Sequence, residues 1–163
     1  LLYVYNNNYK RTNTAKSLLC ALNNINDDDD IIWLNGDVVF DNNVIKSVVD
    51  FDGACVAVNT KPVDSEEVKY NLNEDGTIKQ ISKIIKDGLG EAVGINKIMG
   101  TQLNLYKKTL DQCEEQDYFE RGLEISIEKG MKIFPVDITQ YFCIEVDNQG
   151  DLENVNSVIN NNL

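Results

Sequence analysis

Two aspartates follow apolar runs that are typical of buried strands, and this placement could supply carboxylate oxygens to a metal ion. Asp37 comes shortly after the run 31–34, and Asp147 ends the run that begins at residue 142. In open α/β sheets, ligands bind outside the carboxyl ends of the strands. Carboxylate oxygens with exchangeable waters suit Mg²⁺, so the two aspartates predict a magnesium site. An ordinary turn at Asp37, and an Asp147 that serves the N-terminus of the following helix, are the alternatives.

The residue types that are missing narrow the chemistry further. The 163 residues include no histidine, which excludes from this chain Ser-His-Asp and Cys-His nucleophiles, His-ligated zinc and histidine acid–base catalysis. The four cysteines are widely spaced without a CxxC pair, which favours reduced thiols and a cytoplasmic location. Catalysis here must therefore rest on carboxylates, lysines, backbone dipoles or a hard metal.

The net charge and the hydropathy of the chain argue against two kinds of partner, nucleic acids and membranes. A net charge of -12 argues against DNA or RNA as a partner, because binding to a phosphate backbone needs clustered Lys and Arg. It is compatible with a small phosphorylated ligand if Mg²⁺ bridges the acidic site to the phosphates. No apolar run approaches the roughly 18 to 20 residues that span a bilayer, so we expect no membrane partner.

Hydrophobic periodicity predicts one α/β domain over residues 1–163. The expected architecture is a doubly wound, mostly parallel mixed sheet with a small β-hairpin insertion, whose turn lies at Asn73-Glu74-Asp75-Gly76. The predicted strands are 2–5, 31–34, 54–59, 68–71, 77–84, 92–98, 131–138 and 142–146. The predicted helices are 12–23, 42–49, 103–113, 118–129 and 152–159.

Five stretches, taken in order, resemble the nucleotidyltransferase family that includes sugar-1-phosphate nucleotidylyltransferases and bacterial phosphocholine cytidylyltransferases. They are YKRTNTAKSL at 9–18, NGDVVFD at 35–41, VKY at 68–70 with DG at 75–76, GEAVGI at 90–95, and IEVD at 144–147 with DL at 151–152. Each stretch alone is weak, and the resemblance rests on their order and spacing. It implies a Rossmann-like nucleotidyltransferase fold.

The resemblance also implies a reaction and its partners. A nucleoside triphosphate, with CTP as a guess, would donate its nucleoside monophosphate to a phosphorylated small molecule and release pyrophosphate. The acceptor would be a sugar-1-phosphate or a choline-like or polyol phosphate. Because the acceptor phosphate is already ionised, no general base is needed, and the absence of histidine is explained. The alternatives are a non-catalytic binding module or pseudoenzyme of the same fold, and a metal-dependent glycosyltransferase, for which the first Asp of Asp-x-Asp is missing.

The resemblance assigns roles to individual residues. Asp37 and Asp147 would hold the catalytic Mg²⁺. Lys69 would offset phosphate charge, and Glu91 and Gly94 would line the acceptor pocket. The positions expected at the substrates are Asn13, Ser17, Lys69, Glu91 and Gly94.

Ordinary structural roles are the alternatives for three of these residues. Asn13 could simply cap a helix, Lys69 could be a solvated surface lysine, and Glu91 could be a surface carboxylate.

Members of the family bind the triphosphate with a Gly-rich loop. No stretch of this chain matches that loop. We therefore expect the chain to lack the N-terminal part of the domain, and not to bind a nucleoside triphosphate in the family's way. A sheet without its first strand would expose an apolar edge, which predicts self-association.

Overall fold

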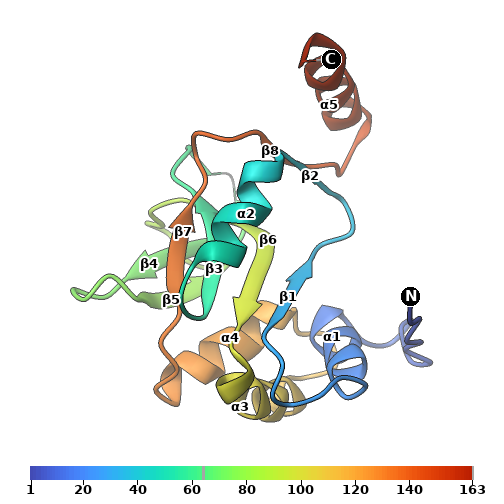
Figure 1. Cartoon of the computed structure of the whole chain (residues 1–163), viewed down its shortest axis with the longest axis vertical. Coiled ribbons are helices and arrows are strands. Elements are labelled where there is room, and N and C mark those ends of the chain that lie inside the picture. The colour runs from blue at the N-terminus through green and yellow to red at the C-terminus, as the bar shows by residue number, and fades with distance from the viewer. Residues whose placement is uncertain (64, 163) are drawn as a thin grey trace.

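A mixed β-sheet lies between one helix on one face and three helices on the other (Figure 1). This computed structural model describes residues 1–63 and 65–162. The helices are α1 (Thr14–Leu22), α2 (Asn42–Asp50), α3 (Gly100–Gln112), α4 (Phe119–Glu128) and α5 (Gln149–Asn162). The strands are β1 (Ile31–Leu34), β2 (Val38–Phe40), β3 (Cys55–Asn59), β4 (Lys69–Leu72), β5 (Ile78–Ser82), β6 (Glu91–Ile98), β7 (Phe134–Asp137) and β8 (Cys143–Glu145).

The central strand β6 organises the sheet. It pairs antiparallel with β3 along nearly its whole length, so β1 and β4 share its other edge. Beyond β3 lies β7 in parallel, and beyond β4 lies its hairpin partner β5. Strands β1, β3 and β7 therefore run in one direction and β6 in the other. This confirms the predicted fold class, a mixed α/β sheet with a β-hairpin insertion.

The alternation of side chains along β3 divides the interior into two cores. Val56 and Val58 face α1, α3 and α4, whereas Cys55 and Ala57 face α2. In the larger core, Trp33 of β1 stacks on the ring of Tyr106 at 5.2 Å between centroids. Five successive buried residues in β3 are thus explained by helices on both faces of the sheet.

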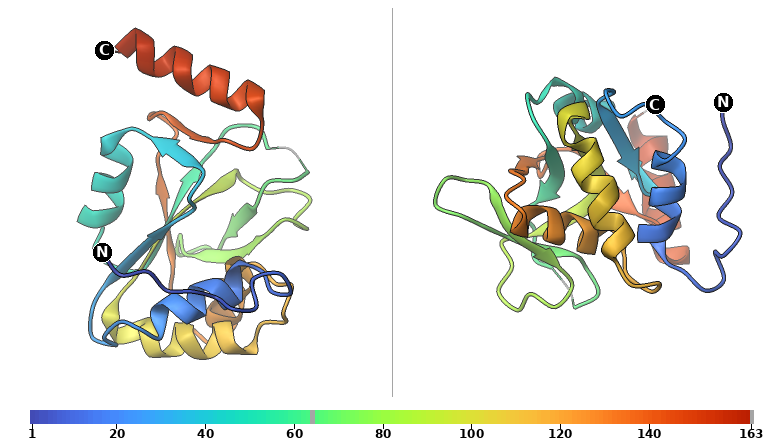
Figure 2. Two further views of the ribbon diagram at one scale, coloured as in Figure 1. Left: turned by 90° about the vertical axis from the view of Figure 1, so that its right-hand side faces the viewer. Right: turned by 90° about the horizontal axis from the view of Figure 1, so that it is seen from below.

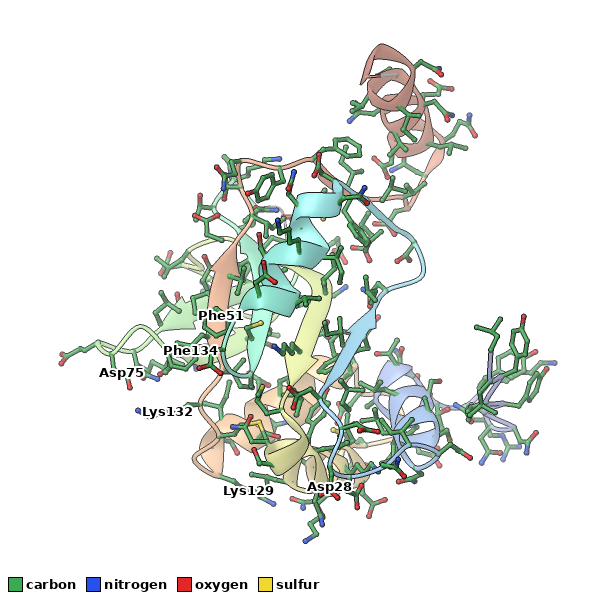
Figure 3. All side chains as sticks on the ribbon, in the orientation of Figure 1. Asp28, Phe51, Asp75, Lys129, Lys132 and Phe134 are labelled. Carbon is green, nitrogen blue, oxygen red and sulfur yellow. The ribbon has the colours of Figure 1, made fainter. Side chains whose placement is uncertain are left out.

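The β4–β5 hairpin is held at its turn by Asp75. Its Oδ1 accepts hydrogen bonds from the Thr77 hydroxyl at 2.6 Å and the Thr77 amide at 3.1 Å. Its Oδ2 pairs with Lys132, which precedes β7, at 3.1 Å (Figure 3). These contacts, with the Thr77 hydroxyl bond the largest, lower the pKa of Asp75 to about 2.

The structure corrects several sequence-based boundaries. Residues 2–5 do not form a strand, because no described strand pairs with them, and Leu2, Tyr3 and Tyr5 are exposed. Strand β2 was not predicted. Helices α3 and α5 each begin three residues earlier than predicted. Strand β7 has four residues, fewer than the predicted strand 131–138. No described helix is both long and apolar enough to cross a membrane.

Helix α5 extends away from the rest of the molecule (Figure 2). In the left view it stands at the top, beyond the short β2–β8 ribbon, and its contacts run mainly to β8. The chain's first residues run beside α1 at the opposite side of the sheet from α2 (Figure 2).

Candidate functional site

Three carboxylates converge where the two-stranded ribbon of β2 and β8 leaves the main sheet. Asp37 immediately precedes β2, Glu145 ends β8, and Asp147 follows two residues later. The ribbon pairs Val38 with Glu145, and the Val146 amide donates to the carbonyl of Asp37 at 2.9 Å. One oxygen from each carboxylate lies within 4.8 Å of the others. The structure therefore brings together the two aspartates singled out in the sequence.

The triad of Asp37, Glu145 and Asp147 has the chemistry of a site for a hard cation. All three residues are exposed. Loss of hydration is the largest effect on the Glu145 carboxyl group and raises its pKa, and repulsion from the two aspartates raises it further. A hydrogen bond donated by the side-chain amide of Asn35, at 3.3 Å, opposes that rise. Oxygen ligands that leave room for water suit Mg²⁺, so the residues present fit this ion.

Gly94 of β6 positions Asn35 beside the triad. Gly94 has φ of +72°, and a Cβ added there would lie 2.5 Å from Nδ2 of Asn35. The backbone N–H of Asn35 donates a hydrogen bond to the Gly94 carbonyl at 2.9 Å. Glycine is therefore required both by the backbone conformation and by this close approach. The described contacts of Gly94 give it this positioning role, and its predicted place in an acceptor pocket stays a prediction.

A cavity of about 490 Å³ opens beside the triad and is lined by Asp147, Glu91 and Lys61, among others. Glu91 accepts a hydrogen bond from the Asn59 side chain at 2.8 Å, and burial raises the pKa of its carboxyl group. The structure thus places Glu91 at the cavity next to the candidate metal ligands. The carboxylate of Asp151, also at this cavity, accepts the amides of Asp147 and Asn148, both at 3.1 Å, and so fixes the turn into α5.

The other residues predicted at the substrates have local partners. Asn13 caps α1 by accepting from the Thr14 amide at 2.8 Å, and Ser17 accepts from the Asn6 side chain at 2.9 Å. Lys69 is buried, and its ammonium group donates to the carbonyls of Ser65, Glu67 and Lys83. None of the three is among the described residues that line the cavity beside the triad, and their roles toward substrate stay predictions.

Sequence reasoning missed Glu145 and Lys83. Glu145 could have been found from the Glu-x-Asp spacing, because residues two apart in a strand point to the same side. Lys83 comes directly after β5, and its charge lowers the pKa of both Glu145 and Glu120. Its ammonium group lies 5.0 Å from the centre of the Tyr118 ring. Among the described lysines, Lys61 lines the cavity beside the triad, whereas Lys83 and the buried Lys69 do not.

Comparison with known proteins gives both a family and a fold. A model of the family described as a domain of unknown function, DUF6564, matches residues 1–85. No curated protein matches the chain. Similar solved structures include the inositol-1-phosphate CTP transferase from T. maritima, with 19% identity and a TM-score of 0.69. They also include the CTP:phosphocholine cytidylyltransferase LicC from Streptococcus pneumoniae, with 12% identity and a TM-score of 0.76.

The similarity covers most of this chain but a smaller share of each solved protein. The match covers 86% of this chain and 58% of the T. maritima protein, and 94% of this chain and 67% of LicC. A putative glucose-1-phosphate thymidylyltransferase from Bacillus anthracis matches over 91% of this chain and 61% of its own, with 14% identity and a TM-score of 0.70. At these identities the likeness establishes that the chain has the nucleotidyltransferase fold.

Proposed function

This chain belongs to the DUF6564 family, and we propose that it carries the metal-binding and acceptor-binding residues of a nucleotidyltransferase. The proposed reaction transfers a nucleoside monophosphate from a nucleoside triphosphate to a phosphorylated small molecule and releases pyrophosphate. The observation that carries the proposal is the convergence of Asp37, Glu145 and Asp147 within 4.8 Å, on a fold shared with nucleotidyltransferases.

In this proposal the chain contributes charge and position, and no proton transfer is required. An oxygen of the ionised acceptor phosphate attacks the α-phosphorus of the triphosphate, and the bond to the β-phosphate breaks to release pyrophosphate. Bound at the triad, Mg²⁺ would neutralise phosphate charge. Asn35 would fix the orientation of Glu145 through the hydrogen bond that its side-chain amide donates.

The cavity beside the triad is the proposed place of the acceptor, with Glu91 on its wall. We also propose that Asn13, Ser17 and Lys69 contact substrate. The case for them is weaker than for Glu91, because their side chains have other partners in the structure. CTP is the proposed nucleotide. Solved proteins of this fold include a CTP transferase for inositol-1-phosphate and a cytidylyltransferase for phosphocholine.

The first experiment is a calorimetric titration with Mg²⁺, which depends only on residues in this chain. We expect one ion per chain, and an affinity that falls about tenfold or more in Asp37→Asn and in Asp147→Asn. Asp52→Asn is the matched control, since it makes the same change at an exposed aspartate on the loop after α2. Unchanged Mg²⁺ affinity in both triad variants would overturn the proposed site.

The second experiment measures pyrophosphate release with four nucleoside triphosphates and a set of phosphorylated acceptors. Release that requires both an acceptor and Mg²⁺, and that is lost in Asp147→Asn, would support the transferase. Binding of Mg²⁺, acceptor and nucleotide without release would favour the binding module or pseudoenzyme. Hydrolysis or transfer from a nucleotide-sugar would instead favour the glycosyltransferase.

A further inference from the structure

The cavity beside the triad carries far more negative than positive charge among its described lining residues. One lysine, Lys61, faces six carboxylates there, those of Glu66, Glu67, Glu91, Glu145, Asp147 and Asp151. A phosphate monoester carries roughly -1.5 to -2 charges near neutral pH, so these carboxylates repel a phosphorylated acceptor. Mg²⁺ at the triad would offset only the charges at that end of the cavity. Phosphate binding therefore requires a further cation, and Lys61 is the cation that the described lining offers.

The ammonium group of Lys61 is free to bind a ligand. The residue is exposed, and its ammonium group forms no ion pair or hydrogen bond with residues 1–63 or 65–162. Two buried lysines differ in this respect. Lys69 donates to three carbonyls, and Lys97 donates to the carbonyls of Val49 and Phe51 at the end of α2. Those two lysines serve the fold, whereas the charge of Lys61 remains available at the cavity.

Asn59, the last residue of β3, fixes the backbone of Lys61. Asn59 is only 6% exposed, and its Oδ1 accepts a hydrogen bond from the backbone N–H of Lys61 at 3.1 Å. Its Nδ2 donates to the Glu91 carboxylate at 2.8 Å. Gly90 holds Asn59 in place, because a Cβ added at Gly90 would overlap the carbonyl oxygen of Asn59. One buried amide thus ties Lys61 to Glu91, and both residues line the same cavity.

The charge of Lys61 acts inside the cavity. Burial is the largest effect on Glu91 and raises the pKa of its carboxyl group, while the Asn59 hydrogen bond and the charge of Lys61 oppose that rise. Burial also raises the pKa of the Cys143 thiol to about 11, and Lys61 again opposes the rise. Glu91 and Cys143 both line the cavity. Lys61 is therefore close enough to act on an anion bound beside them.

We propose that Lys61 binds the phosphate of the acceptor and so fixes where the acceptor lies in this cavity. This inference rests on the proposed function, because it assumes that the acceptor occupies the cavity beside the triad. The ammonium group of Lys61 donates a charge-assisted hydrogen bond to a phosphate oxygen. The phosphate is then shared between Lys61 and the metal site, which leaves Glu91 for the rest of the acceptor.

The test titrates ethyl phosphate into the chain in the presence of saturating Mg²⁺ and follows binding by ³¹P NMR. We expect Lys61→Gln to weaken the binding of ethyl phosphate about tenfold or more, since a charge-assisted hydrogen bond is lost. Lys61→Arg keeps the charge and the donor and should retain most of the affinity. Lys79→Gln is the matched control and should bind as the wild type does, because it makes the same change in charge at an exposed lysine of β5 outside this lining. The Mg²⁺ affinity should not fall in any of these variants.

The outcomes separate this inference from the proposed function. If Lys61→Gln binds ethyl phosphate as tightly as the wild type, or no more weakly than Lys79→Gln, the role of Lys61 is overturned and the metal site stands. Binding of Mg²⁺ but not of ethyl phosphate by the wild-type chain would overturn it in the same way. If Mg²⁺ does not bind either, the proposed function is overturned as well. Thermal unfolding of each variant shows whether a lost affinity merely reflects a lost fold.

Discussion

At the scale of single residues, Gly94 links the backbone of β6 to the arrangement of the triad. Gly94→Ala should lower the free energy of unfolding by about 2 kcal/mol, because alanine at positive φ is strained and its Cβ meets the Asn35 side chain. It should also weaken Mg²⁺ binding, since Asn35 orients Glu145. Urea unfolding and Mg²⁺ titration measure the two effects.

Gly130→Ala is the matched control for this substitution. Gly130 has φ of +90°, but a Cβ there would meet nothing within 4 Å. We expect about 1 kcal/mol of backbone strain and unchanged Mg²⁺ affinity. Equal losses of stability and of metal binding in the two variants would show that contact with Asn35 does not matter.

Glu120 should make the stability of the chain depend on pH. Burial, the largest effect, raises the pKa of its carboxyl group from 4.5 to about 7. Between these values the folded state holds a proton that the unfolded state has released, so stability falls as the pH rises through this window. The full penalty, on the order of 3 kcal/mol, is present above pH 7.

Glu120→Gln removes this penalty, because its amide does not ionise. The difference in unfolding free energy between this variant and the wild type should therefore grow in favour of the variant from about pH 5 to about pH 8. Urea unfolding of both proteins across this range measures it, and other groups cancel because both proteins share them. A difference that is constant with pH would mean that Glu120 titrates normally.

At the scale of elements, Asp41 connects the β2–β8 ribbon to α2. Its amide donates to the Phe142 carbonyl at 2.8 Å, while its side chain caps α2 by accepting from the Asn43 amide at 2.7 Å. Asp41→Ala should lower the unfolding free energy by about 1 kcal/mol. Asp41→Asn keeps a capping acceptor and should lose only a few tenths. A similar loss in both variants would show that the charge, and not the cap, stabilises α2.

The elements also show what the sequence could and could not predict. Long periodic segments such as α4 and β6 were found, because their patterns are set by the faces they bury. Strand β2 has only three residues and was missed, since so short a run carries no periodicity. Residues 2–5 have the composition of a strand, but a strand needs a neighbour to accept its hydrogen bonds. Glu120 escaped notice because its burial depends on how α4 packs against β5.

At the scale of the whole molecule, one edge of the main sheet is unpaired among the described residues, and the chain's first residues expose apolar side chains. Among the described residues, β1 pairs only with β6, and Leu34 at its end is 42% exposed. Leu2, Tyr3 and Tyr5 are exposed as well. An open edge favours strand pairing with a second copy of the chain. The net charge of -12 opposes that association, and salt weakens the opposition.

Sedimentation velocity should therefore show association that increases with protein concentration and with salt. Leu34→Lys should shift the chain toward the monomer, because a lysine at an open edge disfavours pairing. Leu89→Lys makes the same change in charge at a leucine that is 52% exposed on the loop before β6, so it controls for net charge. If both variants behave alike, the association depends on charge. If the wild-type chain stays monomeric at high concentration and high salt, the open edge does not pair.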